Sequence, residues 1–258
     1  MWRLARTPAP NSEQASPGNA GTVTRATDAW VSVVIPALNE ATTIAEVVRS
    51  VPREIATEVI VVDNGSDDGT GSRARDAGAR VIWHPHRGYG RACFAGFRAV
   101  DARCRIVVFL DGDGSDCPEL MGLLVDPILG GSQDFVIGSR TRGDREPGSL
   151  GLVQLAAGRG AGLLLAAMYG VRYTDMGPFR AIRRDALARL GMREETYGWN
   201  LEMQMRAART GLRILEVPVP HRCRVGGKSK VSGTVRGTVA AGVRIFATFL
   251  RVASARLE

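Results

Sequence analysis

The sequence predicts an α/β fold, a single domain in which a mostly parallel central sheet is flanked by helices. Between residues 30 and 139, short apolar runs alternate with segments of helical periodicity. This alternation is typical of parallel strands joined by right-handed helical crossovers. The apolar runs are continuous, which indicates strands that are buried on both faces. A chain of 258 residues is long enough for one large α/β domain or two small ones.

The elements are expected in a regular order from Trp30 onward. Strands are predicted at 31–36, 58–63, 79–84, 105–110, 134–139 and 212–220, and helices within 37–51, 72–79, 87–100, 118–129, 197–210 and from 234. Asn39 or Thr42 is expected to cap the first helix, because both side chains can accept a hydrogen bond from its first turn. Pro218 places the last strand at a sheet edge, since proline cannot donate to a ladder.

Composition limits the classes of function. The net charge of +8 and the pI of about 10.0 predict attraction to anions such as nucleotides, anionic lipid or nucleic acid. No two of the four cysteines form a CxxC pair, so neither a zinc site nor a disulfide framework is indicated and a reducing cytoplasm is expected. Residues 1–29 have the composition of a disordered tail. No apolar run reaches the roughly 18 residues that a transmembrane helix needs.

One stretch indicates the chemistry of the protein. The apolar run at 106–110 ends in Asp111-Gly112-Asp113-Gly114. Two acids at the carboxyl end of a buried strand are costly unless a cation compensates them, and open α/β sheets bind ligands at that end. Carboxylates combined with phosphate oxygens suit Mg²⁺ or Mn²⁺. We therefore predict a metal–diphosphate site, and the alternative is an ordinary Asp/Gly-rich turn.

Polar residues also follow the neighbouring strands of the predicted sheet. Asp63 ends the strand at 58–63, and a glycine-rich turn containing Gly88 precedes the helix within 87–100. In a parallel sheet, the loops that carry Asp63, Gly88 and Asp111 open on the same edge. This convergence favours a binding site over an ordinary turn.

Together these residues resemble an inverting, nucleotide-sugar-dependent glycosyltransferase of family 2, whose fold is the Rossmann-like GT-A fold. The resemblance runs from Val31 to Ser232. Its second half is most similar to polyprenyl-phosphate (dolichol-phosphate-type) sugar synthases, through the Asp-x-x-x-Phe-Arg segment at 175–180 and the basic GGKSK loop at 226–230. We expect a GT-A domain at 30–233 and an amphipathic C-terminal helix at 234–258.

The resemblance implies roles for residues on the donor side. The residues that would hold the nucleotide are Pro36, Ala37, Asn39, Glu40, Asp63, Gly88, Arg91, Asp111 and Gly112. Asp63 would contact the base and ribose. Asp113 would hold the metal, which bridges the diphosphate and stabilises charge on the leaving group. Asp116 is a weaker candidate in the same loop.

The acceptor side is expected to contain acids and cations. The cations that would gather anionic oxygens are Arg140, Arg180, Arg222, Arg224, Lys228 and Lys230. Asp175 and Glu202 join Asp113 as candidate catalytic residues, because a hydroxyl acceptor needs a general base. The alternative for Glu202 is an ion pair with Arg206, and the alternative for Asp175 is a helix cap.

The leading hypothesis is a metal-dependent hexosyltransferase that moves a sugar from a UDP- or GDP-sugar to a polyprenyl phosphate. It would be cytoplasmic and peripheral on the inner membrane face, held by basic charge and the C-terminal helix. On that helix Val239, Val243, Phe246 and Leu250 form an apolar stripe, which would either face lipid or pack on the sheet. A small soluble hydroxyl acceptor is the alternative. A nucleic-acid-binding module is a distant one, disfavoured by an aromatic content of 6%.

Overall fold

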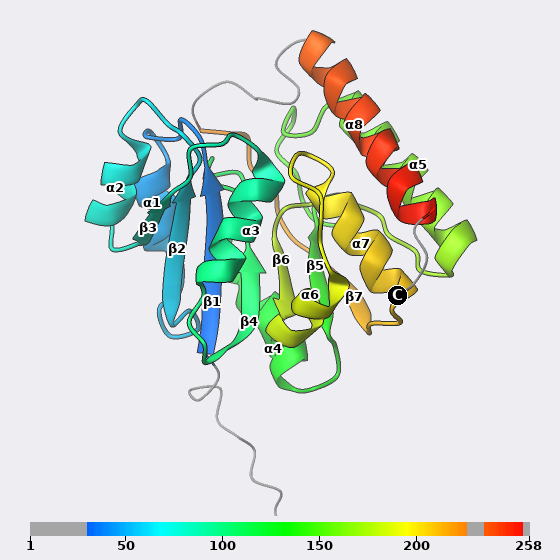
Figure 1. The fold of residues 1–258 in the computed structure, drawn as a ribbon, viewed down its shortest axis with the longest axis horizontal. Helices are drawn as coiled ribbons and strands as arrows, with labels where there is room; N and C mark the ends of the chain where they lie inside the picture. The colour runs from blue at the N-terminus through cyan, green and yellow to red at the C-terminus, as the bar shows by residue number, and fades with distance from the viewer. Residues whose placement is uncertain (1–29, 226–234, 255–258) are drawn as a thin grey trace, which may run out of the picture.

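The computed structural model describes residues 30–225 and 235–254. The tail predicted at 1–29 lies outside these residues, as do Lys228 and Lys230. The described chain forms an α/β fold around a seven-stranded sheet with the order β3-β2-β1-β4-β6-β5-β7 (Figure 1). This arrangement confirms the predicted fold class.

Every strand predicted from the sequence is present, within a few residues of its expected bounds. The strands are β1 (Trp30–Ala37), β2 (Glu58–Asp63), β3 (Arg80–Trp83), β4 (Cys104–Phe109), β5 (Phe135–Ser139), β6 (Arg180–Arg183) and β7 (Ile214–Pro218). The α-helices are α1 (Ile44–Ser50), α2 (Thr70–Asp76), α3 (Tyr89–Ala99), α4 (Gly122–Leu129), α5 (Leu152–Tyr169), α6 (Arg184–Leu190), α7 (Trp199–Arg209) and α8 (Val235–Ser254). The helix predicted at 118–129 is divided into a 3₁₀ turn, Pro118–Leu120, and α4. Strand β7 lies at an edge of the sheet, as Pro218 predicts.

The first half of the sheet is parallel, and its carboxyl ends lie together. In the pairing of β1 with β2, Ala37 is opposite Asp63. In the pairing of β1 with β4, Val34 is opposite Phe109. The segments after β1, β2 and β4 therefore leave the sheet at one edge, as the sequence predicts for the loops of Asp63 and Asp111.

Strand β6 is absent from the sequence-based prediction. It lies between β4 and β5 and runs antiparallel to both. Its sequence is Arg-Ala-Ile-Arg, and two apolar residues between arginines provide neither an apolar run nor a clear alternation. Because Phe109 is opposite Arg180, the segment before β6 reaches the same edge as the carboxyl ends of the parallel strands.

The sheet separates two hydrophobic core layers. On one face Val33 and Ile35 of β1 pack with residues of α1, α2 and α4. On the other face Val34 packs with residues of α3, α6 and α7, and α5 and α8 extend this layer. Alternate side chains of a strand point to opposite faces, so the continuous apolar strands serve both layers.

The first helix is not capped as predicted. The N-cap residue of α1 is Thr43 rather than Asn39 or Thr42. Asn39 instead adopts a left-handed conformation with φ of 54°, and its side-chain oxygen accepts a hydrogen bond from the Asp67 amide (3.0 Å). Asn39 therefore holds the turn after β1 against the loop after β2 by a hydrogen bond.

Helix α8 lies within the range predicted for the C-terminal helix, and three residues of its predicted apolar stripe are exposed rather than packed on the sheet. Val243, Phe246 and Leu250 are 63%, 62% and 51% exposed. The face that packs against α7 instead contains Thr248 and Val252, which are buried. None of the helices in the described part of the chain is long and apolar enough to cross a membrane.

Candidate active site

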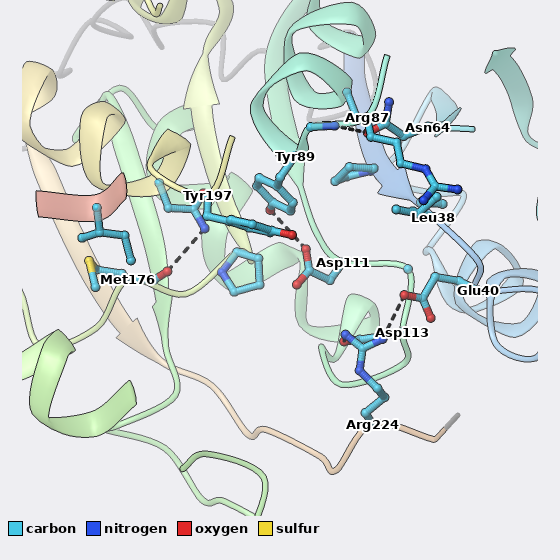
Figure 2. A pocket seen from close by; sticks show the side chains of 18 of the residues that line it. Leu38, Glu40, Asn64, Arg87, Tyr89, Asp111, Asp113, Met176, Tyr197 and Arg224 are labelled. Carbon is cyan, nitrogen blue, oxygen red and sulfur yellow. Dashed lines mark hydrogen bonds and ion pairs between the residues drawn. The ribbon is translucent and has the colours of Figure 1, made fainter. Parts of the chain in front are cut away.

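A pocket of about 490 Å³ opens at the sheet edge where the strands end. This volume is typical of small-molecule sites. The lining residues from the first half of the chain are Pro36, Ala37, Leu38, Glu40, Asn64, Arg87, Gly88, Tyr89, Ala92, Asp111, Gly112 and Asp113. Those from the second half are Arg140, Met176, Pro178, Tyr197, Asn200, Arg224 and Ile245, and Figure 2 gives a close view of the pocket. The pocket thus extends from the end of β1 to α8.

The acidic loop after β4 is held in place by its own hydrogen bonds. Asp113 is 5% exposed, and its Oδ1 accepts hydrogen bonds from the amide and hydroxyl of Ser115 (2.9 and 2.6 Å). Asp116 Oδ2 accepts one from the Asp111 amide (3.0 Å). Tyr89 of α3 donates its hydroxyl to Asp111 Oδ1 (3.1 Å). The loop therefore carries three carboxyl groups within six residues, of which Asp113 and Asp116 are buried and Asp111 is half-buried.

These carboxyl groups disfavour one another's ionisation. Burial, followed by the charges of Asp113 and Asp116, raises the pKa of Asp111 well above its usual value. Burial also raises the pKa of Asp116 to about 7, with a further contribution from the charge of Asp113. A carboxyl pKa is raised in this way where negative charge lacks compensation. The loop would therefore be stabilised by an added cation.

Three arginines line the pocket, Arg87, Arg140 and Arg224, and the last two are paired with acids. Arg224 binds Glu40 Oε1 through one terminal nitrogen (2.9 Å) and Asp113 Oδ2 through the other (2.8 Å), and Figure 2 shows it between these acids. Arg140 follows β5 and forms a bidentate pair with Asp175 (2.7 and 2.8 Å). The charge of the Arg140 guanidinium is therefore already neutralised by Asp175, which lies outside the acidic loop.

The residues of the loop fit a hard divalent cation. Asp111, Asp113 and Asp116 offer carboxylate oxygens, the ligands that Mg²⁺ and Mn²⁺ prefer, and the raised pKa values of Asp111 and Asp116 indicate missing positive charge. Within the described ranges, however, no three acidic, histidine or cysteine side chains converge closely enough to hold a metal by themselves. A metal at this loop would therefore need further ligands, which phosphate oxygens can supply.

Two polar residues, Asp63 and Asn64, lie at the carboxyl end of β2. Asp63 ends β2 and its Oδ1 accepts a hydrogen bond from the Ser66 amide (2.9 Å). Asn64 faces the pocket, and its side chain accepts from the Gly88 amide (2.7 Å) and donates to the His86 carbonyl (2.7 Å). Sequence reasoning missed Asn64, although it directly follows Asp63 at the end of the strand. Of the predicted donor residues, Asn39, Asp63 and Arg91 do not line the pocket.

The amino end of α3 is covered by another part of the chain. Gly90 and Arg91 donate their amides to the carbonyls of Thr196 and Glu195 (3.2 and 3.0 Å). The Arg91 guanidinium also binds the Glu195 carboxylate. These amides are thus already satisfied by the segment that precedes α7, and Gly88 is the predicted residue of this turn that lines the pocket.

Three other predicted site residues have structural partners. Arg180 is fully buried and donates to the carbonyls of Gly177 and Asn200. Glu202 is also fully buried and accepts from the amides of Arg193 and Glu194 and from Arg206. The ion pair with Arg206, the alternative to a catalytic role, is thus present. Arg222 pairs with Glu119 outside the pocket.

His221 is a residue that sequence reasoning did not select. It follows β7, is 5% exposed, and its Nδ1 has no hydrogen-bond partner among the described residues. Burial and the charge of Arg140 lower its pKa to about 4. A neutral imidazole therefore lies close to the acidic loop, and no sequence motif signalled it.

Comparisons with known proteins agree with this arrangement. The family model described as "Glycosyl transferase family 2" matches residues 32–191. A glycosyltransferase of Mycobacterium tuberculosis is 37% identical over 216 residues, which cover 82% of this chain and 94% of the relative. The undecaprenyl-phosphate mannosyltransferase of Micrococcus luteus is 33% identical over 233 residues, which cover 83% of this chain and 92% of the relative.

A solved structure shares the fold across both halves of the chain. It is glucosyl-3-phosphoglycerate synthase from Mycobacterium tuberculosis in complex with Mn²⁺, UDP-glucose and phosphoglyceric acid. The TM-score is 0.70 at 26% sequence identity, and the match covers 95% of this chain and 87% of the other.

Proposed function

Because the chain belongs to glycosyl transferase family 2, we propose that it inverts the anomeric centre of a UDP- or GDP-sugar and transfers the sugar to a polyprenyl phosphate. The observation that carries this proposal is the acidic loop at a pocket whose lining combines charged and apolar side chains. The acidic loop suits a nucleoside diphosphate with its metal. The arginines and apolar side chains of the lining suit an acceptor that has both a phosphate and a hydrocarbon chain.

On the donor side, Asp113 would bind Mg²⁺ or Mn²⁺ together with the diphosphate. The metal would supply positive charge to the leaving phosphate when bound. Asp111 accepts a hydrogen bond from Tyr89 and would contact the sugar or ribose. Glu40 and Asn64 line the same pocket. The structural neighbour that contains Mn²⁺ and UDP-glucose supports this assignment.

On the acceptor side, the proposal needs no general base. A phosphate monoester is largely ionised at neutral pH, so its oxygen can attack the anomeric carbon without losing a proton. The absence of a general base agrees with the structure, in which Glu202 is buried away from the pocket and Asp175 is engaged by Arg140. Met176, Pro178 and Ile245 line the pocket and would contact the first part of the hydrocarbon chain.

We also propose that α5 and α8 rest on an anionic membrane surface. Their exposed apolar side chains are Leu163, Leu164, Met168, Val243, Phe246 and Leu250. Neither helix contains an Asp or Glu, and Arg159 and Arg244 are exposed. This charge is complementary to anionic headgroups, whereas a second copy would set arginines against arginines. Because Ile245 of α8 lines the pocket, a lipid acceptor would enter close to this surface.

The test is a transfer assay with UDP- and GDP-sugars, Mn²⁺ and a short-chain polyprenyl phosphate. We expect one donor to give a product of inverted anomeric configuration by NMR, and Asp113→Asn to abolish its formation. Asp126→Asn on the exposed surface of α4 is the control with the same charge change. Replacing Lys228 and Lys230 by Ala should raise the KM for the acceptor. Retained configuration, or full activity of Asp113→Asn, would contradict the proposal.

Membrane attachment is tested separately with sedimenting vesicles. We expect the protein to bind vesicles that contain phosphatidylglycerol, and Phe246→Ser with Leu250→Ser to weaken this binding several-fold. Leu123→Ser is the control, because Leu123 is exposed on α4. Equal binding to purely zwitterionic vesicles would argue against the anionic surface.

A phosphorylated soluble acceptor is the second candidate. It is favoured by the structural neighbour that contains phosphoglyceric acid, a small acceptor with both a hydroxyl and a phosphate. Product with phosphoglyceric acid and none with any polyprenyl phosphate would establish this alternative and leave the family assignment unchanged.

A further inference from the structure

Both side-chain oxygens of Asp113 already have partners in this structure. Its Oδ1 accepts hydrogen bonds from the amide and the hydroxyl of Ser115 at 2.9 and 2.6 Å. Its Oδ2 lies 2.8 Å from a terminal nitrogen of Arg224. A divalent metal would need to approach a carboxylate oxygen to about 2.0–2.6 Å, and the guanidinium of Arg224 already lies against the one oxygen that Ser115 leaves.

Arg224 is also the arginine best placed to neutralise this part of the pocket. It lies between Asp113 and Glu40, both of which are buried. Of the other arginines that line the pocket, Arg140 is engaged by Asp175 through two hydrogen bonds and Arg87 is exposed. A buried carboxylate without a cation is strongly destabilising, so the folded protein needs Arg224 at this position when no metal is bound.

We propose that Arg224 is the resident counter-ion of the metal site and that the metal binds Asp113 by displacing it. Guanidinium and metal compete at Oδ2, because the two cations repel each other and both are attracted to the same oxygen. The exchange leaves Arg224 tethered beside the pocket by Glu40, where a donor diphosphate offers it new anionic partners. Metal binding in the absence of the diphosphate is consequently weak, and metal and nucleotide bind cooperatively.

This inference rests on the metal dependence in the proposed function, but its test needs neither donor sugar nor acceptor. Binding of Mn²⁺ to the purified protein is measured by the loss of the electron paramagnetic resonance signal of free Mn²⁺, with and without UDP. We expect Arg224→Gln to bind Mn²⁺ without UDP roughly 10- to 100-fold more tightly than the wild type, as removal of a charged hydrogen bond at Oδ2 implies. UDP should tighten Mn²⁺ binding more in the wild type than in this variant.

Matched variants separate the exchange from general charge effects. Arg189→Gln removes the same charge from a surface ion pair with Asp185, and should bind Mn²⁺ as the wild type does. Arg224→Lys keeps a cation and should remain closer to the wild type than Arg224→Gln. Thermal unfolding provides a second readout: in EDTA, Arg224→Gln should melt below the wild type, and Mn²⁺ should raise its Tm by more than it raises that of the wild type.

Two results would contradict the inference in different ways. If Arg224→Gln binds Mn²⁺ without UDP as weakly as the wild type, or more weakly, Arg224 does not compete with the metal and the exchange is wrong. If the wild type binds no Mn²⁺ even with UDP, the metal dependence in the proposed function fails, and the exchange fails with it.

Discussion

Arg251 of α8 forms ion pairs with Glu194, at 2.7 Å, and with Glu202, at 3.3 Å. Glu194 also accepts a hydrogen bond from Thr248 of α8 (2.8 Å). The segment that contains Glu194 continues to the carbonyls that bind the amides of Gly90 and Arg91, and to Tyr197 in the pocket wall. The last helix of the described chain is therefore connected by polar contacts to the loop that closes the amino end of α3.

This connection predicts that Arg251→Ala loosens the pocket loop. We expect the Gly90 and Arg91 amides to exchange hydrogen faster, because their acceptor carbonyls in the 195–196 segment lose support. Hydrogen exchange followed by NMR or mass spectrometry measures the effect. Arg244→Ala, on the exposed face of α8, is the control and should leave both amides unchanged. Unaltered exchange in Arg251→Ala would show that α8 does not hold the loop.

Glu202→Gln tests whether this acid contributes to catalysis or to stability. Its carboxylate is fully buried and accepts hydrogen bonds from two amides and from Arg206. Loss of its charge weakens the ion pairs with Arg206 and Arg251, so we expect the free energy of unfolding to fall by about 1–3 kcal/mol. Urea unfolding measures this change. Turnover per folded molecule should remain within a few-fold of the wild type, and a loss of about 10²-fold or more would instead indicate a general base.

Gly90→Ala tests the close approach of α3 to the loop before α7. A Cβ atom at Gly90 would lie 2.0 Å from the Glu194 carbonyl oxygen, and a backbone atom cannot move aside as a side chain can. We expect a loss of about 1–3 kcal/mol in the free energy of unfolding. Gly160→Ala in α5 is the matched control: its Cβ would meet nothing within 4 Å, so the better helix propensity of alanine should stabilise the protein by about 0.5–1 kcal/mol.

His221 predicts an acid-sensitive stability. Its pKa is lowered to about 4 in the folded state, whereas an unfolded histidine has a pKa near 6.5. Between these values the unfolded state binds a proton that the folded state does not, so stability decreases as the pH falls from about 6.5 to about 4. The contribution is at most roughly 3 kcal/mol. Urea unfolding in EDTA across this range measures it, and His221→Gln should show a smaller decrease; an identical pH profile would contradict the lowered pKa.

Local patterns were sufficient to predict most of the fold. Continuous apolar runs identified the strands at 58–63 and 105–110 because parallel strands are buried on both faces and need apolar residues at every position. The order of these runs then placed the ends of β2 and β4 at one edge. The four-residue strand β6 was missed because its position between β4 and β5 comes from pairing with distant residues.

The sequence alone determined which residue types gather at the pocket, since strand ends and glycine turns are local features with a fixed direction in the sheet. It identified Glu40, Asp111, Asp113, Arg140 and Arg224, all of which line the pocket. Tertiary structure decided the partner of each charge: Arg224 faces Asp113, Arg140 holds Asp175, and Glu202 lies beside Arg251. These partners are 111, 35 and 49 residues apart in the chain. Side chains that distant meet only when the packed layers bring them together, and no local pattern encodes that meeting.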